Sequence, residues 1–304
     1  MKKLLSISLA LTMIILCGQN ALAINNDMLW EDTTIDSETV NVSCEEYPEA
    51  YIEINSPKNQ NTRQISVLGR TIMTATVYVE ENYAIADDEE ICVSSRLLTE
   101  DEVNAIGKEN FNNFVCEPTA NVPHQSTSRG KLTISLEVAP NVSTQYAKQY
   151  TLIGIAKWSG LVSHLNPSNT PAAGEDYAGF MWGGGYDFSN QTSQAVDNFG
   201  VSRTVYDADV DANTAYVWSA QEGALDREED DYLKNWRSDL TLEKVVLTGN
   251  GNTTSISYKY IHTYTTVAGS LNVSTGSGGV SSSFSLSGVD HQWSLILTHS
   301  EIPY

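Results

Sequence analysis

Four oxygen-bearing side chains at alternate positions are the clearest candidates for chemistry in this chain. They are Asp207, Asp209, Asp211 and Asn213. Hard oxygen ligands of this kind are the ones with which a loop binds calcium. An EF-hand loop needs glycine at its sixth position and glutamate at its twelfth, where this chain has Ala212 and Trp218. We therefore expect a calcium site of a different geometry, and the alternative interpretation is a solvated acidic turn.

Aromatic residues beside glycine and aspartate indicate a second kind of site, one for a sugar. The C–H faces of a sugar stack on aromatic rings, and nearby polar groups bind its hydroxyls. The candidate ligand-binding residues are Trp182, Tyr186, Asp187 and Trp218. The alternative is that these rings fill the core of a β domain.

No sequence motif for catalysis is present. The chain has no His-Glu-x-x-His zinc motif, no Gly-x-Ser-x-Gly nucleophile elbow and no phosphate-binding glycine loop. Two carboxylates for glycoside cleavage need only meet in space, so a secreted hydrolase remains a third hypothesis with no catalytic residue assigned. We expect a binding protein rather than an enzyme.

The first 23 residues predict secretion. Lys2 and Lys3 precede an apolar run from Leu4 to Leu16, and Ala21-Leu22-Ala23 fits the small-x-small site of a signal peptidase. A membrane anchor needs about 20 apolar residues, so we expect a cleaved leader and a released extracellular protein, of bacterial origin. The net charge of −21 disfavours nucleic acid and anionic lipid as partners.

Secretion determines which cysteines can form a disulfide. Cys17 is lost with the leader, and an oxidising exterior favours one disulfide among the remaining three. Cys92 and Cys116 flank a predicted helix, which favours a disulfide between them. A pairing of Cys44 with either partner, or no disulfide at all, stays open.

The pattern of residues divides the chain into three parts after the leader. Residues 24–120 predict a small acidic β-rich module with one short helix near 100–114, which begins at a capping box of Thr99 and Glu102. Residues 121–130 have the composition of a linker. Residues 131–304 alternate apolar and polar side chains, which predicts a mainly β fold, an antiparallel β-sandwich.

The C-terminal stretch is rich in serine and threonine and nearly without charge. Lys259 and Asp290 are the charged residues between positions 245 and 300. Membrane-spanning strands alternate polar and apolar side chains over about 9–11 residues, and the strands of 255–288 roughly meet this length. A half-exposed antiparallel meander shows the same alternation, and we favour that interpretation.

Together these patterns predict a secreted binding protein of β-sandwich type, whose ligand is a glycan, a surface or a protein, with calcium as a possible aid. A secreted β-pore-forming or toxin-like protein that uses strands 255–288 is the alternative. A membrane is a partner only under that alternative.

Overall fold

The computed structural model describes residues 40–42, 62–67, 70–86, 89–111, 116–118, 125–143, 148–159, 174–211, 214–221, 233–244, 253–264, 270–274, 283–289 and 291–303. Chain contacts divide the protein into residues 1–39 and a compact unit from Val40 to Tyr304. Every described residue belongs to the second unit, and the predicted leader, residues 1–23, lies outside the described residues.

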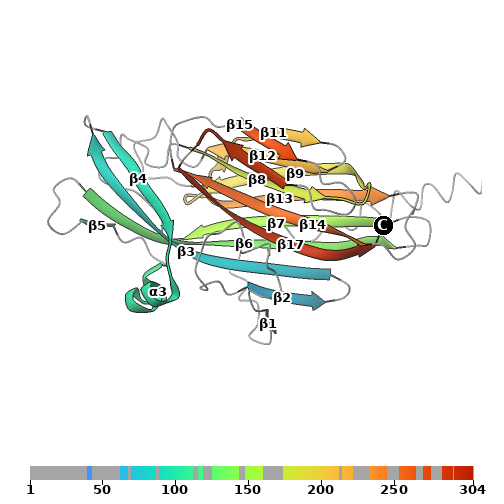
Figure 1. The fold of residues 1–304 in the computed structure, drawn as a ribbon, viewed down its shortest axis with the longest axis horizontal. Coiled ribbons are helices and arrows are strands. Elements are labelled where there is room, and N and C mark those ends of the chain that lie inside the picture. The colour runs from blue at the N-terminus through green and yellow to red at the C-terminus, as the bar shows by residue number, and fades with distance from the viewer. Residues whose placement is uncertain are drawn as a thin grey trace, which may run out of the picture. The chain divides into compact units, whose positions relative to one another are not determined.

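The larger of two main sheets has ten strands among the described residues (Figure 1). Its hydrogen-bonded path runs β1 (Val40–Val42), β2 (Thr62–Val67), β3 (Arg70–Ala86), β6 (Gln125–Ser143), β7 (Lys148–Ser159), β13 (Leu233–Lys244), β9 (Asp187–Asp197) and β10 (Ser202–Arg203). Beside this path, β4 (Glu89–Leu97) pairs with β3, and β5 (Cys116–Pro118) pairs with β6.

The smaller main sheet has five strands in the order β11 (Val205–Asp211), β12 (Ala215–Gln221), β8 (Glu175–Trp182), β14 (Thr253–Thr263) and β17 (Gln292–Pro303). A separate two-stranded sheet consists of β15 (Ser270–Ser274) and β16 (Ser283–Ser287). Each of these neighbouring pairs is antiparallel.

Alternation along the strands explains how the two main sheets pack. In β6, Leu132, Ile134 and Leu136 are fully buried, while the residues between them are partly exposed, as period-two side-chain directions require. These residues join side chains of the smaller sheet in one hydrophobic core. The predicted fold class, a mainly antiparallel β-sandwich with one short helix in its N-terminal part, is confirmed.

The helix begins where the sequence predicts it. In α3 (Glu100–Ile106), Thr99 caps the helix, and Glu102 reaches back to the Thr99 backbone N–H at 2.7 Å. The helix ends at Gly107, whose φ of 91° favours glycine. A 3-10 turn, η3 (Lys108–Phe111), continues the chain. The observed helix is therefore shorter than the one predicted near residues 100–114.

The expected linker is also placed differently. Residues 125–130 form the first part of β6 and pair with β3, while residues 121–124 lie outside the described residues. The strands on either side of this segment therefore share one sheet. No helix in the described part of the chain is long and apolar enough to cross a membrane.

Candidate functional site

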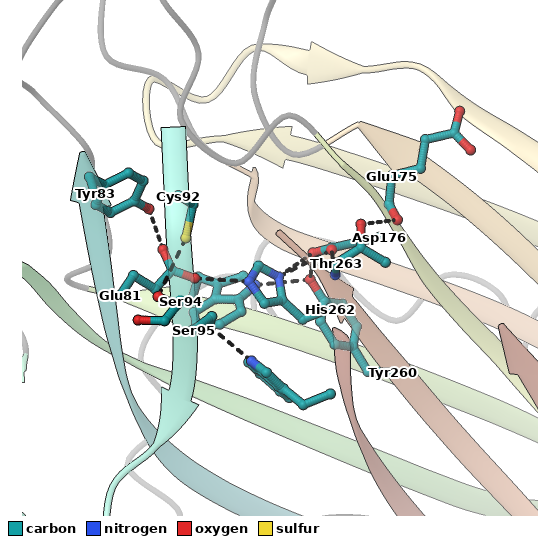
Figure 2. Close-up of polar contacts among 12 residues, drawn as sticks. Glu81, Tyr83, Cys92, Ser94, Ser95, Glu175, Asp176, Tyr260, His262 and Thr263 are labelled. Carbon is teal, nitrogen blue, oxygen red and sulfur yellow. Dashed lines mark hydrogen bonds and ion pairs between the residues drawn. The ribbon is translucent and has the colours of Figure 1, made fainter. Parts of the chain in front are cut away.

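A buried polar network connects the two main sheets (Figure 2). His262 of β14 lies between two carboxylates: its Nε2 is 2.9 Å from Glu81 Oε1 of β3, and its Nδ1 is 3.2 Å from Asp176 Oδ1 of β8. All three side chains are at most 1% exposed. A chain of two acids and one imidazole thus spans the core.

Each carboxylate has further donors. The Tyr260 hydroxyl and the Thr263 backbone N–H donate to Asp176, the latter at 3.0 Å. The Tyr83 hydroxyl donates to Glu81. The Tyr260 hydroxyl also accepts from Trp158 Nε1 at 2.9 Å, which ties the network to β7. Buried charges are tolerated when their hydrogen bonds are supplied in this way.

Aromatic rings surround the imidazole. The ring centres of Trp293 and Trp158 lie 4.9 and 5.3 Å from that of His262, and Tyr264 stacks on it at 6.2 Å. Trp293 Nε1 of β17 donates to Ser95 Oγ of β4 at 2.9 Å. This bond connects β4 to the rings around His262. The rings exclude water and strengthen the electrostatic interactions inside.

The acidity of Glu81 reflects this setting. Burial by itself raises the pKa of the Glu81 carboxyl, but the hydrogen bond and the charge of His262, with further bonds from Tyr83 and Ser95, outweigh burial and lower the pKa below its usual range. Glu81 is therefore held as a carboxylate in the folded protein.

This arrangement fits a structural role better than a catalytic one. A hydrolase would need two carboxylates in an open cleft, and here the acids are joined by an imidazole inside the core. None of these three residues was among the candidate site residues predicted from the sequence. His262 does share one face of its strand with Tyr258 and Tyr260, and a histidine on a buried strand face needs polar partners; that pattern could have identified it.

The predicted calcium ligands are divided by a β-bulge. Asp207 pairs with Trp218, which faces the core, whereas Asp209 and Asp211 pair with Val217 and Ala215 on the opposite face. The extra residue of the bulge causes this change of face. Asn213 lies outside the described residues.

Among the residues that the structure describes, no three His, Cys, Asp or Glu side chains gather where they could hold a metal ion. Asp209 Oδ1 accepts the neighbouring Val210 N–H at 2.8 Å, and the Asp207 side chain bonds to Tyr216. Calcium binding by this acidic strand stays a prediction, which a calcium-dependent melting temperature would test.

The rings chosen for sugar binding lie in the core. Trp182, Tyr186 and Trp218 are at most 3% exposed, and Trp182 Nε1 donates to the Tyr186 carbonyl at 2.8 Å. A ring buried on both faces cannot stack on a sugar, so these three residues have the core role that was the alternative. Asp187 alone among the four is exposed.

The structure separates the two cysteines that were expected to pair. Cys92 lies on β4 opposite Tyr83 of β3, and Cys116 lies on β5 opposite Ser128 of β6. Since β3 pairs with β6, two strands intervene, which is roughly 14 Å at about 4.8 Å per strand. A disulfide needs Cα atoms about 4.4–6.8 Å apart. Cys44 lies outside the described residues.

Exposed apolar side chains concentrate in one segment. Five large hydrophobic residues are exposed in the described part of the chain, and four of them, Phe199, Val201, Tyr206 and Val210, lie between positions 199 and 210. This segment, named the edge segment below, leads from edge strand β10 of the larger sheet to edge strand β11 of the smaller sheet.

Comparisons with known proteins identify no family. No family model matches the chain, and no curated protein matches it. Among solved structures, the C-terminal domain of the AgI/II polypeptide BspA of Streptococcus agalactiae has 6% identity, covers 75% of this chain and 92% of its own, and gives a TM-score of 0.25. The collagen adhesin of S. aureus has 7% identity, 81% and 96% coverage, and a TM-score of 0.22. Scores this low establish neither a family nor a function.

Proposed function

We propose that this chain is a secreted, non-enzymatic protein that binds a protein partner outside the cell through the edge segment. The leader-like residues 1–23 support secretion. The observation that carries the proposal is the concentration of exposed Phe199, Val201, Tyr206 and Val210 in one short segment, which includes an edge strand of each main sheet. Exposed aromatic residues are enriched where proteins bind each other.

Charge indicates the chemistry of the partner. Edge strand β11 carries Tyr206, Asp209 and Asp211 on one face and Asp207 and Val210 on the other. A complementary surface therefore combines apolar side chains with lysine or arginine. A glycan is less favoured, since the rings once considered for a sugar are core residues.

Binding measurements on matched variants test the proposal. The double variant Phe199→Ser/Tyr206→Ser and the control Val93→Ser each replace apolar side chains that are exposed, and Val93 lies on β4, away from the edge segment. Both are compared with the wild type by surface plasmon resonance against a panel of purified extracellular matrix and cell-surface proteins.

We expect the double variant to bind at least tenfold more weakly, because truncating central aromatic residues removes much of the binding energy, and the control to bind as the wild type does. Equal binding by both variants would place the binding surface elsewhere. A wild type that binds only in a parallel glycan array would replace the protein partner with a sugar.

A further inference from the structure

The hairpin formed by β15 and β16 is an excursion from a continuous ladder. Thr263, the last residue of β14, pairs with Gln292, the first of β17. The next residue, Tyr264, donates its N–H to the His291 carbonyl at 3.1 Å. The chain thus leaves the smaller sheet and returns at the same point. Between Lys259 and Asp290 the sequence has no Asp, Glu, Lys or Arg.

The hairpin has two chemically distinct faces. Leu271 and Val273 of β15 and Phe284 and Leu286 of β16 share one face and pack on the smaller sheet. The opposite face is polar, and its exposed residues are Ser270, Asn272, Ser285 and Ser287.

The outer face of the smaller sheet supplies the apolar surface beneath the hairpin. Its buried residues there are Tyr177, Met181, Ala215, Val217, Ile261 and Ile296. Lys259, only 3% exposed, donates its ammonium to the Phe284 carbonyl at 2.7 Å. Among the described strands, β15 and β16 pair only with each other. The hairpin is held to the sheet by side-chain packing, by the Lys259 bond, and by Gln292 Nε2 of β17, which donates to the Leu286 and Val289 carbonyls at 2.9 Å.

The register shows how the two ladders are related. Each step beyond Thr263 moves the partner one residue back from Gln292, so a continued β14–β17 ladder would place Leu271 opposite Phe284. In the hairpin, Leu271 lies opposite Leu286. The difference is two residues, and a shift of two keeps every side chain on its own face. The hairpin is therefore the continuation of the β14–β17 ladder, folded back over the sheet.

We propose that the β15–β16 hairpin is a displaceable element that leaves the smaller sheet, straightens along the β14–β17 ladder and inserts its apolar face into a lipid bilayer. The two strands have five residues each, fewer than the about 9–11 that a strand needs to cross a bilayer, so the apolar face enters one leaflet. The serine face would meet water or another copy's hairpin, in the alternation typical of such strands.

The docked state is favoured in water, and a bilayer offsets part of the free-energy cost of release. Release in water exposes the apolar faces of both the hairpin and the sheet, whereas a bilayer buries the hairpin again. Gly288, with a φ of 83° and no atom within 4 Å of an added Cβ, lies in the connection to β17, where glycine permits the backbone to fold back. The net charge of −21 favours zwitterionic over anionic lipid.

Vesicle flotation with a matched pair of variants tests this proposal on the full chain without its leader. Leu271→Asp places a carboxylate on the apolar face, and Asn272→Asp places one on the polar face of the same strand. The measurement is the fraction of protein that floats with phosphatidylcholine vesicles, and phosphatidylglycerol vesicles test the expected lipid preference.

We expect the wild type to float with phosphatidylcholine, the Leu271→Asp partition coefficient to fall at least tenfold, and Asn272→Asp to remain within twofold of the wild type. Equal loss in both variants would overturn the proposal, as would absence of wild-type flotation with either lipid.

Hydrogen exchange on the wild type avoids any folding defect of a variant. On addition of vesicles, amides of 270–274 and 283–287 are expected to change their exchange rates, while those of α3 stay constant. Unchanged exchange in the hairpin, with protein bound to vesicles, would show that another surface binds lipid and would refute insertion. Neither measurement depends on the edge segment.

Discussion

Replacing Glu81 by glutamine is expected to destabilise the sandwich strongly. The Glu81 carboxylate accepts from His262 Nε2 at 2.9 Å and from the Tyr83 hydroxyl. Glutamine keeps the shape of the side chain but offers one acceptor oxygen in place of two, and its amide group can only donate. At least one donor in the core is then left without an acceptor.

The magnitude follows from burial. Removing one partner of a buried ion pair costs about 3–5 kcal/mol, and a buried unsatisfied donor costs about 1–3 kcal/mol. Because His262 keeps its contact with Asp176, we expect a loss of about 3 kcal/mol in the free energy of unfolding. At about 2–4 °C per kcal/mol for a chain of this size, the melting temperature falls by roughly 6–12 °C.

Urea unfolding followed by tryptophan fluorescence measures this loss, because Trp158 and Trp293 contact the His262 ring. The control is Glu100→Gln, which removes a carboxylate at an exposed position in the first turn of α3. A charge at the exposed beginning of a helix is worth about 1 kcal/mol or less.

The stabilisation by Glu81 depends on pH in a predictable direction. Since the pKa of Glu81 is lowered in the folded protein from its usual value of 4.5, the stabilisation is fully present above about pH 4.5 and is lost as the pH falls through the folded-state pKa. The stability difference between wild type and Glu81→Gln should therefore be full at pH 7 and narrow below pH 4.5. Equal losses in the two variants, or a difference independent of pH, would refute the role given to this network.

Three further substitutions test separate parts of the fold. In Gly154→Ala the added methyl carbon would lie 2.3 Å from Cε2 of Tyr258. Urea unfolding should show that the free energy of unfolding falls by about 2–3 kcal/mol. An equal fall when the same substitution is made in a Tyr258→Leu variant would contradict this contact. Tyr258→Phe removes a buried hydroxyl that has no partner among the described residues, so the free energy of unfolding should rise by about 1 kcal/mol; a decrease would indicate a missing partner. Thr99→Ala removes the acceptor of the Glu102 N–H at 3.2 Å and should lower the stability of α3 by about 1 kcal/mol. The measurement is amide exchange, which should become faster in α3 alone. Unchanged exchange in α3 would contradict the role of Thr99 as a cap.

Local sequence patterns predicted the parts of the fold that depend on near neighbours. The alternation of Leu132, Ile134 and Leu136 determines which face of β6 is buried, and the Thr99 and Glu102 capping box determines where α3 begins. Each pattern involves residues at most a few positions apart, so side-chain direction alone converts it into structure.

The polar network could not be predicted in the same way. His262 is 181 residues from Glu81 and 86 from Asp176 along the chain. Neither acid stands out among the 38 acidic residues, and only the packing of the two sheets brings them to one imidazole.

The predictions for the ligand-binding and calcium-binding residues failed or stayed open because of burial and strand register. Glycines beside Trp182 and Tyr186 are typical of a surface loop, yet both rings are buried between the sheets. The aspartates of β11 occupy alternate positions, yet one extra residue in the strand places Asp207 on the other face. Period-two alternation is reliable only where the ladder is unbroken.

Strand β14 explains why the serine-rich stretch has two different parts. Its inner face carries His262, which meets the larger sheet, and its outer face carries Lys259, which meets the hairpin. Ser257, also on the outer face, shares a hydrogen bond with Thr298 at 2.8 Å. The polar residues of β14 are thus bonded to protein on both faces, and their alternation indicates a strand between two layers rather than a wet surface.

The hairpin differs from β14 in keeping one whole face in contact with water, since Asn272 and Ser285 are exposed while Phe284 is fully buried. A two-faced, uncharged segment can exchange one apolar contact for another without burying a charge. The same exchange by β14 would bring the charge of Lys259 into the bilayer and break the His262 contacts in the core. In the proposed insertion, β15 and β16 therefore leave the sheet, and β14 remains in the sandwich.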